Sequence, residues 1–144
     1  MKTGTSDKVV ILIKQATLLS DKIANPILEP YNLTMSQYKV IKFLCNNPLG
    51  NVRQIDIEHH FQLRNPTVTG IIKNLEKNGW VERVQNPDDA RSKFLSPSKK
   101  TLELRGELNN LGSKVEKKLI KNLTKEEYKE LVLLLKKILA DGND

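Results

Sequence analysis

The side chains of this sequence that are best suited to binding chemistry cluster between residues 65 and 77. The segment begins with Asn65, Pro66, Thr67, Thr69 and Gly70 and continues with Lys73, Asn74 and Lys77. Amides and hydroxyls can hydrogen-bond to base edges, and ammonium groups neutralise phosphates. Small side chains let a backbone approach a ligand closely. The pattern therefore indicates recognition of a polyanion rather than bond-breaking chemistry.

Two further groups of polar residues flank this segment. Upstream, Arg53 and Gln54 are suited to phosphate contacts. Downstream, Asp89, Arg91 and Lys93 follow the turn-forming run Asn86-Pro87-Asp88-Asp89. An Arg at the tip of a narrow loop can enter a minor groove, where negative potential is concentrated. A neighbouring carboxylate can hold its guanidinium in position, so Asp89 is included in the predicted site.

Residues that could support catalysis or bind a metal are scarce. There is one cysteine, Cys45, and the two histidines, His59 and His60, are adjacent. Adjacent residues on a helix point about 100° apart and make a poor pair of metal ligands. We expect Cys45 to be a small buried hydrophobe rather than a redox sensor. No nucleophile–base pair or phosphate loop occurs, so we expect no enzymatic activity, no metal and no cofactor.

Composition limits the answer without deciding it. The 144 residues carry a net charge of +7, with 38% hydrophobic and 28% charged residues. A basic surface favours a polyanionic partner, but charge alone fits DNA binding, RNA binding or mere solubility. No apolar run approaches the roughly 20 residues that span a bilayer, and the first residues lack a secretory signal pattern. We expect no membrane association and a cytoplasmic location.

The middle of the chain contains signals for a helix-turn-helix followed by a hairpin. Thr34 and Gln37 form a capping box for one helix. Asn51 is expected to cap the next helix, with Ile55, Ile57 and Phe61 facing inward. Asn65-Pro66 resembles an N-cap followed by a first-turn proline, and Gly79 suits the end of that helix. Alternation in 80–84 and 93–95 predicts two strands joined by a charged tip.

Both ends of the chain predict amphipathic helices. The first covers residues 8–28, a second is expected to open at Ser96-Pro97, and a last one follows the capping box at Thr124. The apolar residues that these helices are expected to bury against a second copy of the chain include Leu12, Leu19, Leu104, Leu108, Leu111, Val115, Leu131, Leu135 and Ile138.

Taken together, the motifs of residues 33–99 resemble those of the multiple-antibiotic-resistance-regulator (MarR) family. The matching runs are Leu33-Thr34-Met35-Ser36-Gln37-Tyr38, Asn65-Pro66-Thr67-Val68-Thr69, the stretch from Leu75 to Arg83 and the stretch from Asn86 to Lys93. The resemblance implies a mainly α fold, a winged helix-turn-helix of three helices and a two-stranded β-wing flanked by N- and C-terminal dimerisation helices. We expect a single domain over 6–140, with dimerisation helices at 6–31 and 97–140. The DNA-binding lobe covers 33–96, its helix-turn-helix 51–78 and its wing 80–96.

The same resemblance implies a homodimeric, sequence-specific DNA-binding transcriptional regulator. It is expected to be a repressor that binds a pseudo-palindromic operator in double-stranded DNA, and its release by a small-molecule effector stays open. The chain departs from the family pattern at Gly70 and Ala90, where relatives often carry Arg, and at Glu58 and Lys99, where Ala and Gly are usual. The alternative is a winged-helix protein-interaction module without DNA binding, which would need a neutral or apolar recognition face.

Overall fold

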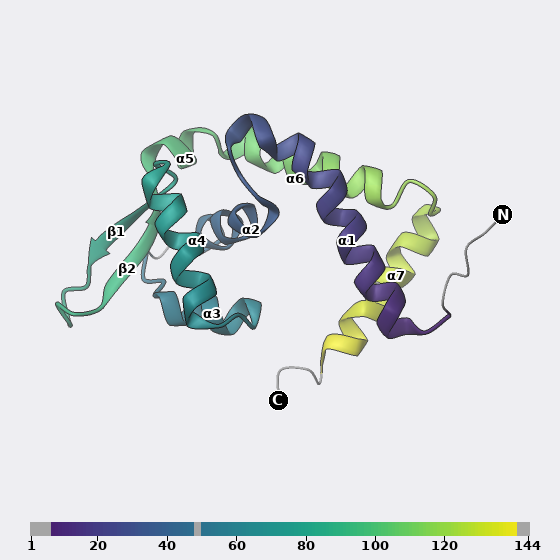
Figure 1. Cartoon of the computed structure of the whole chain (residues 1–144), viewed down its shortest axis with the longest axis horizontal. Coiled ribbons are helices and arrows are strands. Elements are labelled where there is room, and N and C mark those ends of the chain that lie inside the picture. The colour runs from purple at the N-terminus through teal and green to yellow at the C-terminus, as the bar shows by residue number, and fades with distance from the viewer. Residues whose placement is uncertain (1–6, 48–49, 141–144) are drawn as a thin grey trace.

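Seven α-helices, one 3-10 helix and two strands make up the computed structural model over the residues that it describes, 7–47 and 50–140 (Figure 1). The elements are α1 (Val9–Leu28), η1 (Glu29–Tyr31), α2 (Met35–Cys45), α3 (Gln54–Phe61), α4 (Asn65–Lys77), β1 (Val81–Gln85), β2 (Lys93–Pro97), α5 (Lys99–Glu103), α6 (Arg105–Leu119) and α7 (Lys125–Ala140). This order confirms the predicted fold class. Ser6, the predicted start of the domain, lies outside the described residues.

Helices α2, α3 and α4 pack around a shared apolar core. The capping box predicted at the start of α2 is present, because Thr34 Oγ1 accepts the N–H of Gln37 and Gln37 Oε1 accepts the N–H of Thr34. Residues of this core that are almost completely inaccessible to solvent include Ile41, Leu44, Ile57, Val68, Ile72, Leu75 and Leu95. The apolar face of α4, formed by Val68, Ile72 and Leu75, is therefore buried, and its polar face must lie outward.

The start of α3 differs from the prediction. Its N-cap is Arg53 rather than Asn51, and the side chain of Asp56 accepts the N–H of Arg53 at 2.8 Å. The preceding Val52 stays extended because its carbonyl accepts the N–H of Leu95, at 2.7 Å, in an isolated bridge to β2. With this start, Ile57 is buried but Ile55 is 41% exposed, so the prediction that Ile55 faces inward was wrong.

The wing is an antiparallel hairpin that is longer than predicted. Its register runs from Val81 opposite Pro97 to Gln85 opposite Lys93. Because Pro97 still belongs to β2, the expected helix start at Ser96-Pro97 was wrong. The cap is Ser98, whose Oγ accepts the N–H of Thr101. The long helix expected next is divided at Leu104 into α5 and α6.

The apolar stripe of helix α6 is buried within its own chain, mainly against α1. Leu108, Leu111 and Val115 are at most 5% exposed and belong to the same core as Ala24 and Leu28 of α1. Leu104 is partly buried against that core. The prediction that this stripe is covered by a second copy was therefore wrong for these four residues, because the C-terminal half of α1 folds back onto α6 and covers the stripe.

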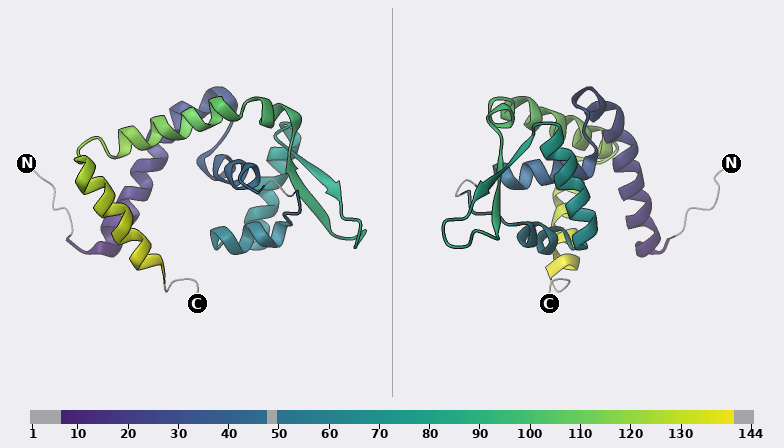
Figure 2. Two further views of the ribbon diagram at one scale, coloured as in Figure 1. Left: turned by 180° about the vertical axis from the view of Figure 1, so that it is seen from behind. Right: turned by 60° about the vertical axis from the view of Figure 1, so that its left-hand side comes forward.

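The N-terminal part of α1 and all of α7 remain uncovered (Figure 2). Helix α7 buries none of its residues, and among its apolar side chains Leu131 is 40% exposed, Leu135 37% and Ile138 55%. Leu12 and Leu19 of α1 are 37% and 48% exposed. Within the described ranges, no helix is both long and apolar enough to cross a membrane.

Candidate nucleic-acid interface

Helix α4 begins differently from the prediction. Arg64 is its N-cap, Asn65 is the first helical residue and Pro66 the second. Asn65 does not cap the helix, because the helix begins one residue earlier than predicted; its side-chain Nδ2 donates to Glu58 Oε2 on α3 at 2.9 Å. Proline is tolerated in the first turn, where a backbone N–H would have no partner within the helix.

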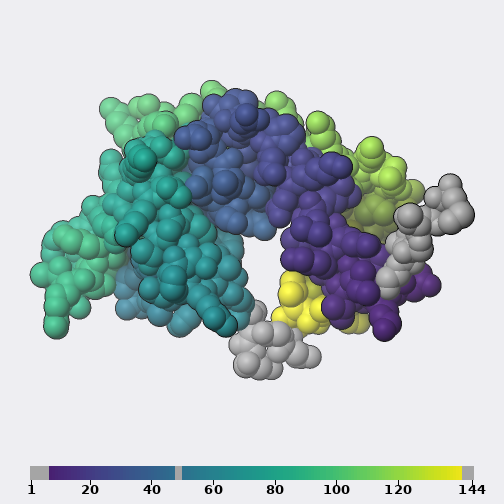
Figure 3. Space-filling model, viewed as in Figure 1, coloured from purple at the N-terminus to yellow at the C-terminus, as the bar shows by residue number. Residues whose placement is uncertain are grey.

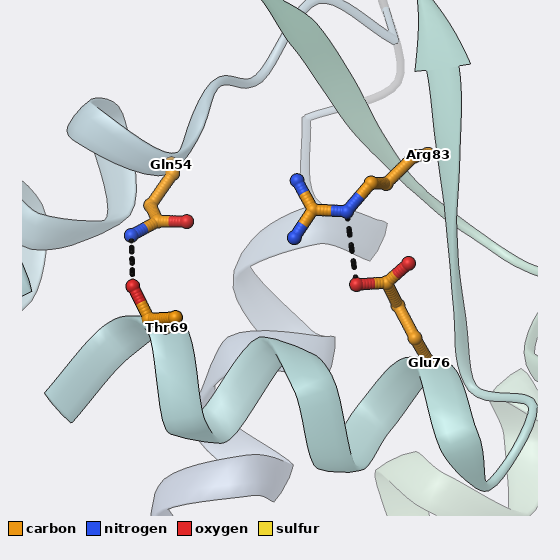
Figure 4. A network of polar contacts seen from close by, with 4 residues as sticks. All are labelled: Gln54, Thr69, Glu76 and Arg83. Atoms are coloured by element: carbon orange, nitrogen blue, oxygen red, sulfur yellow. Dashed lines mark hydrogen bonds and ion pairs between the residues drawn. The ribbon is translucent and has the colours of Figure 1, made fainter. Parts of the chain in front are cut away.

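One flank of α4 is tied to α3 by polar contacts. Gln54 Nε2 donates to Thr69 Oγ1 at 2.8 Å, which joins the first residue of α3 to the second turn of α4 (Figure 4). Thr69 Oγ1 in turn lies 3.5 Å from Asn65 Oδ1. Together with the Asn65–Glu58 contact, these side chains form a continuous hydrogen-bonded chain along the junction of α3 and α4.

The same flank of α4 is tied to the wing near its other end. Arg83 Nε of β1 lies 2.9 Å from Glu76 Oε1 of α4 (Figure 4). Thr69 and Glu76 are seven positions apart, about two turns, so they share one side of the helix. Helix α4 is thus anchored to α3 at one end and to the hairpin at the other. Its position and rotation are fixed before any partner arrives.

The side of α4 that points away from the core forms an exposed ridge, which we call the outer ridge and define as Pro66, Gly70 and Lys73. Steps of four and three residues keep the three on one side of the helix, opposite Val68, Ile72 and Leu75. Among the described residues Lys73 has no hydrogen bond or ion pair, so its ammonium group is available to a ligand.

Two residues of the predicted site lie near the C-terminal end of α4 and border a hollow. Asn74 and Lys77 line an open polar hollow of about 630 Å³ together with residues of α1, η1 and the start of α2. The other walls of this hollow are formed by Asn25, Glu29, Asn32, Leu33, Thr34, Gln37 and Asn78. The structure therefore separates Asn74 and Lys77 from the group formed by Gln54, Asn65 and Thr69. Figure 3 shows an open gap between the winged helix and the terminal helices, below the region where α1 meets α2.

The wing carries an exposed cation at its tip. The side chain of Arg91 is 97% exposed, and its Nε lies 3.8 Å from Asp89 Oδ1, which also accepts the backbone N–H of Arg91 at 3.0 Å. Asn86, nearly buried, accepts the N–H of Asp88 and shapes the turn, as its sequence predicted. Lys93 Nζ donates to Gln85 Oε1 across the strands at 2.7 Å. The carboxylate of Asp89 thus lies beside the guanidinium, as proposed from the sequence.

Arg53 lies at the start of α3, where its guanidinium forms an ion pair with Asp56 at 3.5 Å and the side chain is 52% exposed.

The histidine and cysteine side chains lie apart from this interface. His60 packs against the rings of Phe43 and Phe61, with centroid distances of 4.4 and 4.6 Å. Cys45 is partly buried against the core, consistent with its predicted apolar role. Within residues 7–47 and 50–140, no three His, Cys, Asp or Glu residues gather where they could hold a metal ion.

Sequence reasoning missed two contacts that hold α4 in place. Glu58 was noticed only as an unusual residue, yet it fixes the amide of Asn65. Glu76 and Arg83 were read as parts of a motif, not as a bridge from α4 to β1. Helical spacing could have placed Glu76 on the flank of Thr69, but the position of β1 depends on the whole fold.

Comparison with known proteins gives one consistent family. Residues 33–93 match the profile of the MarR family. The HTH-type transcriptional regulator YwoH of Bacillus subtilis is 36% identical over 115 residues, which is 80% of this chain and 82% of the relative. The homoprotocatechuate degradative operon repressor of Escherichia coli is 25% identical over 137 residues, covering 95% of this chain and 91% of the repressor.

Among solved structures, a mutant of MarR from E. coli complexed with operator DNA has a TM-score of 0.78 and 27% identity. The match covers 89% of this chain and 91% of that one. Its fold, the profile match and the identity to YwoH agree with the geometry described above, and this chain belongs to the MarR family of transcriptional regulators.

Proposed function

We propose that the chain is a homodimeric repressor that binds a pseudo-palindromic operator through α4 and the wing. The observation that carries this proposal is the outer ridge of α4. It is exposed, small at Gly70 and cationic at Lys73, on a helix whose opposite face is buried. An α-helix fits the major groove, and its N-terminal turns can reach base edges and phosphates. The operator complex of the E. coli relative supports this mode of binding.

Each predicted site residue takes a role that follows from its contacts. Lys73 and Arg53 neutralise phosphates, and Gly70 allows the helix backbone to approach DNA because a side chain is absent there. Asn65 and Thr69 are held by contacts within the protein and orient the helix, while Gln54 is bonded through Nε2 alone and keeps its carbonyl oxygen without a partner among the described residues. Thr67 lies beside the outer ridge, near the helix N-terminus. Asn74 and Lys77 border the polar hollow, and Lys77 also follows Lys73 by four residues on the ridge side of α4.

The wing supplies a second contact on each half-site. Arg91 has the geometry of a side chain that enters a minor groove, since it is almost completely exposed at the tip of a narrow hairpin. Lys93, which is hydrogen-bonded to Gln85, adds positive charge at the first residue of β2, next to the tip of the hairpin. Asp89 limits the freedom of the Arg91 guanidinium and so favours one orientation.

Dimerisation is assigned to the exposed apolar side chains of α1 and α7, among them Leu12, Leu19, Leu131, Leu135 and Ile138. Exposed apolar side chains in such number mark a protein interface, and a lone helix of this length is marginal in water without packing. We infer that residues 33–96 form the DNA-binding lobe and that 7–31 and 97–140 form the dimerisation region. In a two-fold dimer the two copies of α4 would meet half-sites about one helical turn apart.

The proposal extends to regulation and location. An effector that changes the spacing between the two winged helices would shift the dimer between binding-competent and incompetent states. A regulator of transcription acts where the DNA is, which supports a cytoplasmic location. We assign no catalytic step, since the family and the relatives are regulators.

The proposal is tested with DNA from the region upstream of the protein's own gene. A labelled duplex is titrated with the full chain and followed by fluorescence anisotropy, with a composition-matched scrambled duplex as the control. We expect the upstream duplex to bind at least about 1,000-fold more tightly than the scrambled one. Equal, weak binding of both duplexes would favour the alternative, a winged-helix module that binds proteins only.

A further inference from the structure

The hydrogen-bonded chain at the α3–α4 junction ends at Glu58, a residue that has no role in the DNA binding proposed above. Glu58 lies on α3, where its Oε2 accepts the amide N–H of Asn65. From Asn65 the contacts continue through Thr69 to Gln54. A carboxylate close to the DNA-facing end of α4 repels phosphates, so its presence calls for a reason beyond affinity.

The carboxylate of Glu58 differs from the side chains of Asn65, Thr69 and Gln54, because it can only accept hydrogen bonds, whereas an amide or a hydroxyl can also donate. Asn65 must therefore turn its N–H group toward Glu58 and its carbonyl Oδ1 toward Thr69. Thr69 then directs its hydroxyl hydrogen toward Oδ1 and keeps a lone pair for Gln54. Gln54 must in turn donate from Nε2 to Thr69.

The donor-to-acceptor direction of these hydrogen bonds is thus set by the carboxylate of Glu58. It also decides whether the free atom of the Gln54 amide is the oxygen or the nitrogen. The Gln54 carbonyl Oε1 points to one side of the bond to Thr69 (Figure 4). Among the described residues no partner occupies that oxygen. Without an acceptor-only group at position 58, the amides of Asn65 and Gln54 could each rotate by half a turn. Gln54 could then offer a donor at the same place.

We propose that Glu58 is a specificity-determining positioning residue: it makes the α3–α4 junction present the acceptor Gln54 Oε1 to the major groove. An acceptor there favours a base with an exocyclic amino group, adenine or cytosine, over guanine or thymine, which offer acceptors in the major groove. One base position in each half-site is read in this way. This inference rests on the proposed DNA binding and adds to it the class of base selected.

The test compares base preferences, which a merely structural role would leave unchanged. The full-length wild type, Glu58→Gln and Glu58→Ala each select duplexes from a randomised pool, and the bound fraction is sequenced. Gln can donate as well as accept, so it keeps the size of the side chain but removes the fixed direction. Glu103→Gln is the matched control, since Glu103 is an exposed acid on α5 outside this chain. Thermal unfolding confirms that each variant is folded.

We expect the wild type and Glu103→Gln to prefer adenine or cytosine at one position per half-site by on the order of tenfold. In Glu58→Gln this preference falls below about threefold, while the other positions keep theirs. A full preference in Glu58→Gln, or an equal loss at all positions, would overturn the inference. A wild type that enriches no sequence at all would instead contradict the proposed DNA binding.

Discussion

At the scale of single residues, Arg91 makes few contacts with the rest of the protein. Its side chain is 97% exposed, and its one recorded ion pair, with Asp89, spans 3.8 Å. Exposed ion pairs contribute about 0–1 kcal/mol to stability. The fold therefore does not depend on Arg91, and a loss of DNA binding on its removal can be attributed to the interface itself.

Replacing Arg91 with Ala is expected to weaken operator binding by roughly 1–3 kcal/mol per wing, in line with a good groove contact. The melting temperature and the oligomeric state should stay at wild-type values. Anisotropy titration on one operator duplex measures the effect, and Lys114→Ala, which removes the same charge from an exposed site on α6, is the control. Equal losses in both variants would mean that only net charge matters.

The companion variant Asp89→Ala separates orientation from electrostatics. If Asp89 orients the guanidinium, its removal weakens operator binding, though less than Arg91→Ala does. If only the local charge counts, removing an acid tightens binding. Tighter binding by Asp89→Ala, together with no effect of Arg91→Ala, would show that the wing does not read DNA in this protein.

Single residues also mark the limit of local sequence rules. Asn65 before Pro66 has the pattern of an N-cap, and Thr34 with Gln37 has the pattern of a capping box. The second prediction is confirmed because both partners lie within one turn. The first was wrong because the helix begins one residue earlier, with Arg64 as the N-cap, and the Asn65 amide donates to Glu58 on another helix. Local motifs predict contacts within an element, but contacts between elements need the fold.

At the scale of elements, the apolar stripes predicted nearly every helix, yet they did not reveal what covers each one. The stripe of α6 and the stripe of α7 look alike in sequence. In the structure, Leu108, Leu111 and Val115 are buried by α1 and α2, whereas α7 buries no residue. Part of this packing depends on a small residue, because Gly112 allows Tyr38 to approach α6 closely.

The contact at Gly112 gives a direct test of that packing. A Cβ at this position would lie 2.6 Å from Tyr38 Oη, whose hydroxyl donates to the carbonyl of Leu108. Burial raises the pKa of Tyr38, in agreement with its enclosed position. Gly112→Ala should therefore destabilise the protein by about 1–3 kcal/mol, because the ring must move and its hydrogen bond is strained.

Gly106 provides the matched control on the same helix, since a Cβ there meets no atom within 4 Å. Gly106→Ala should leave the free energy of unfolding unchanged or raise it by up to about 1 kcal/mol, because Ala favours the helix. Urea unfolding followed by circular dichroism measures both variants. Indistinguishable unfolding curves for the two variants would contradict the close approach of Tyr38 to α6.

At the scale of the whole molecule, the exposed apolar surface is concentrated at one end. Exposed large hydrophobic residues of α1 and α7 include Val10 at 81%, Leu133 at 63% and Leu139 at 63%. The winged helix at the other end exposes polar and cationic groups. This division of the surface supports one arrangement, in which the apolar ends pair and the two winged helices point toward DNA.

The proposed pairing predicts that Leu135→Asp produces a monomer of 16.4 kDa in sedimentation equilibrium at micromolar concentration, whereas the wild type has twice that mass. A carboxylate at the interface would lose its hydration without gaining a partner. Leu135 is 37% exposed on a helix with no buried residue, so the core should stay intact. Leu102→Asp, at a 48% exposed position on α5, should remain a dimer. A wild-type monomer would refute the pairing.

The central claim, that this protein binds DNA through α4 and the wing, is tested most directly by the salt dependence of operator affinity. Each phosphate neutralised by Lys or Arg releases counterions, so the logarithm of affinity falls linearly with the logarithm of salt concentration. With Lys73 and Arg53 contributing from both protomers, we predict about four phosphate contacts and a slope near −4. Lys73→Ala should reduce the steepness by about two, one unit per protomer. A slope near zero, or one that Lys73→Ala leaves unchanged, would contradict the claim.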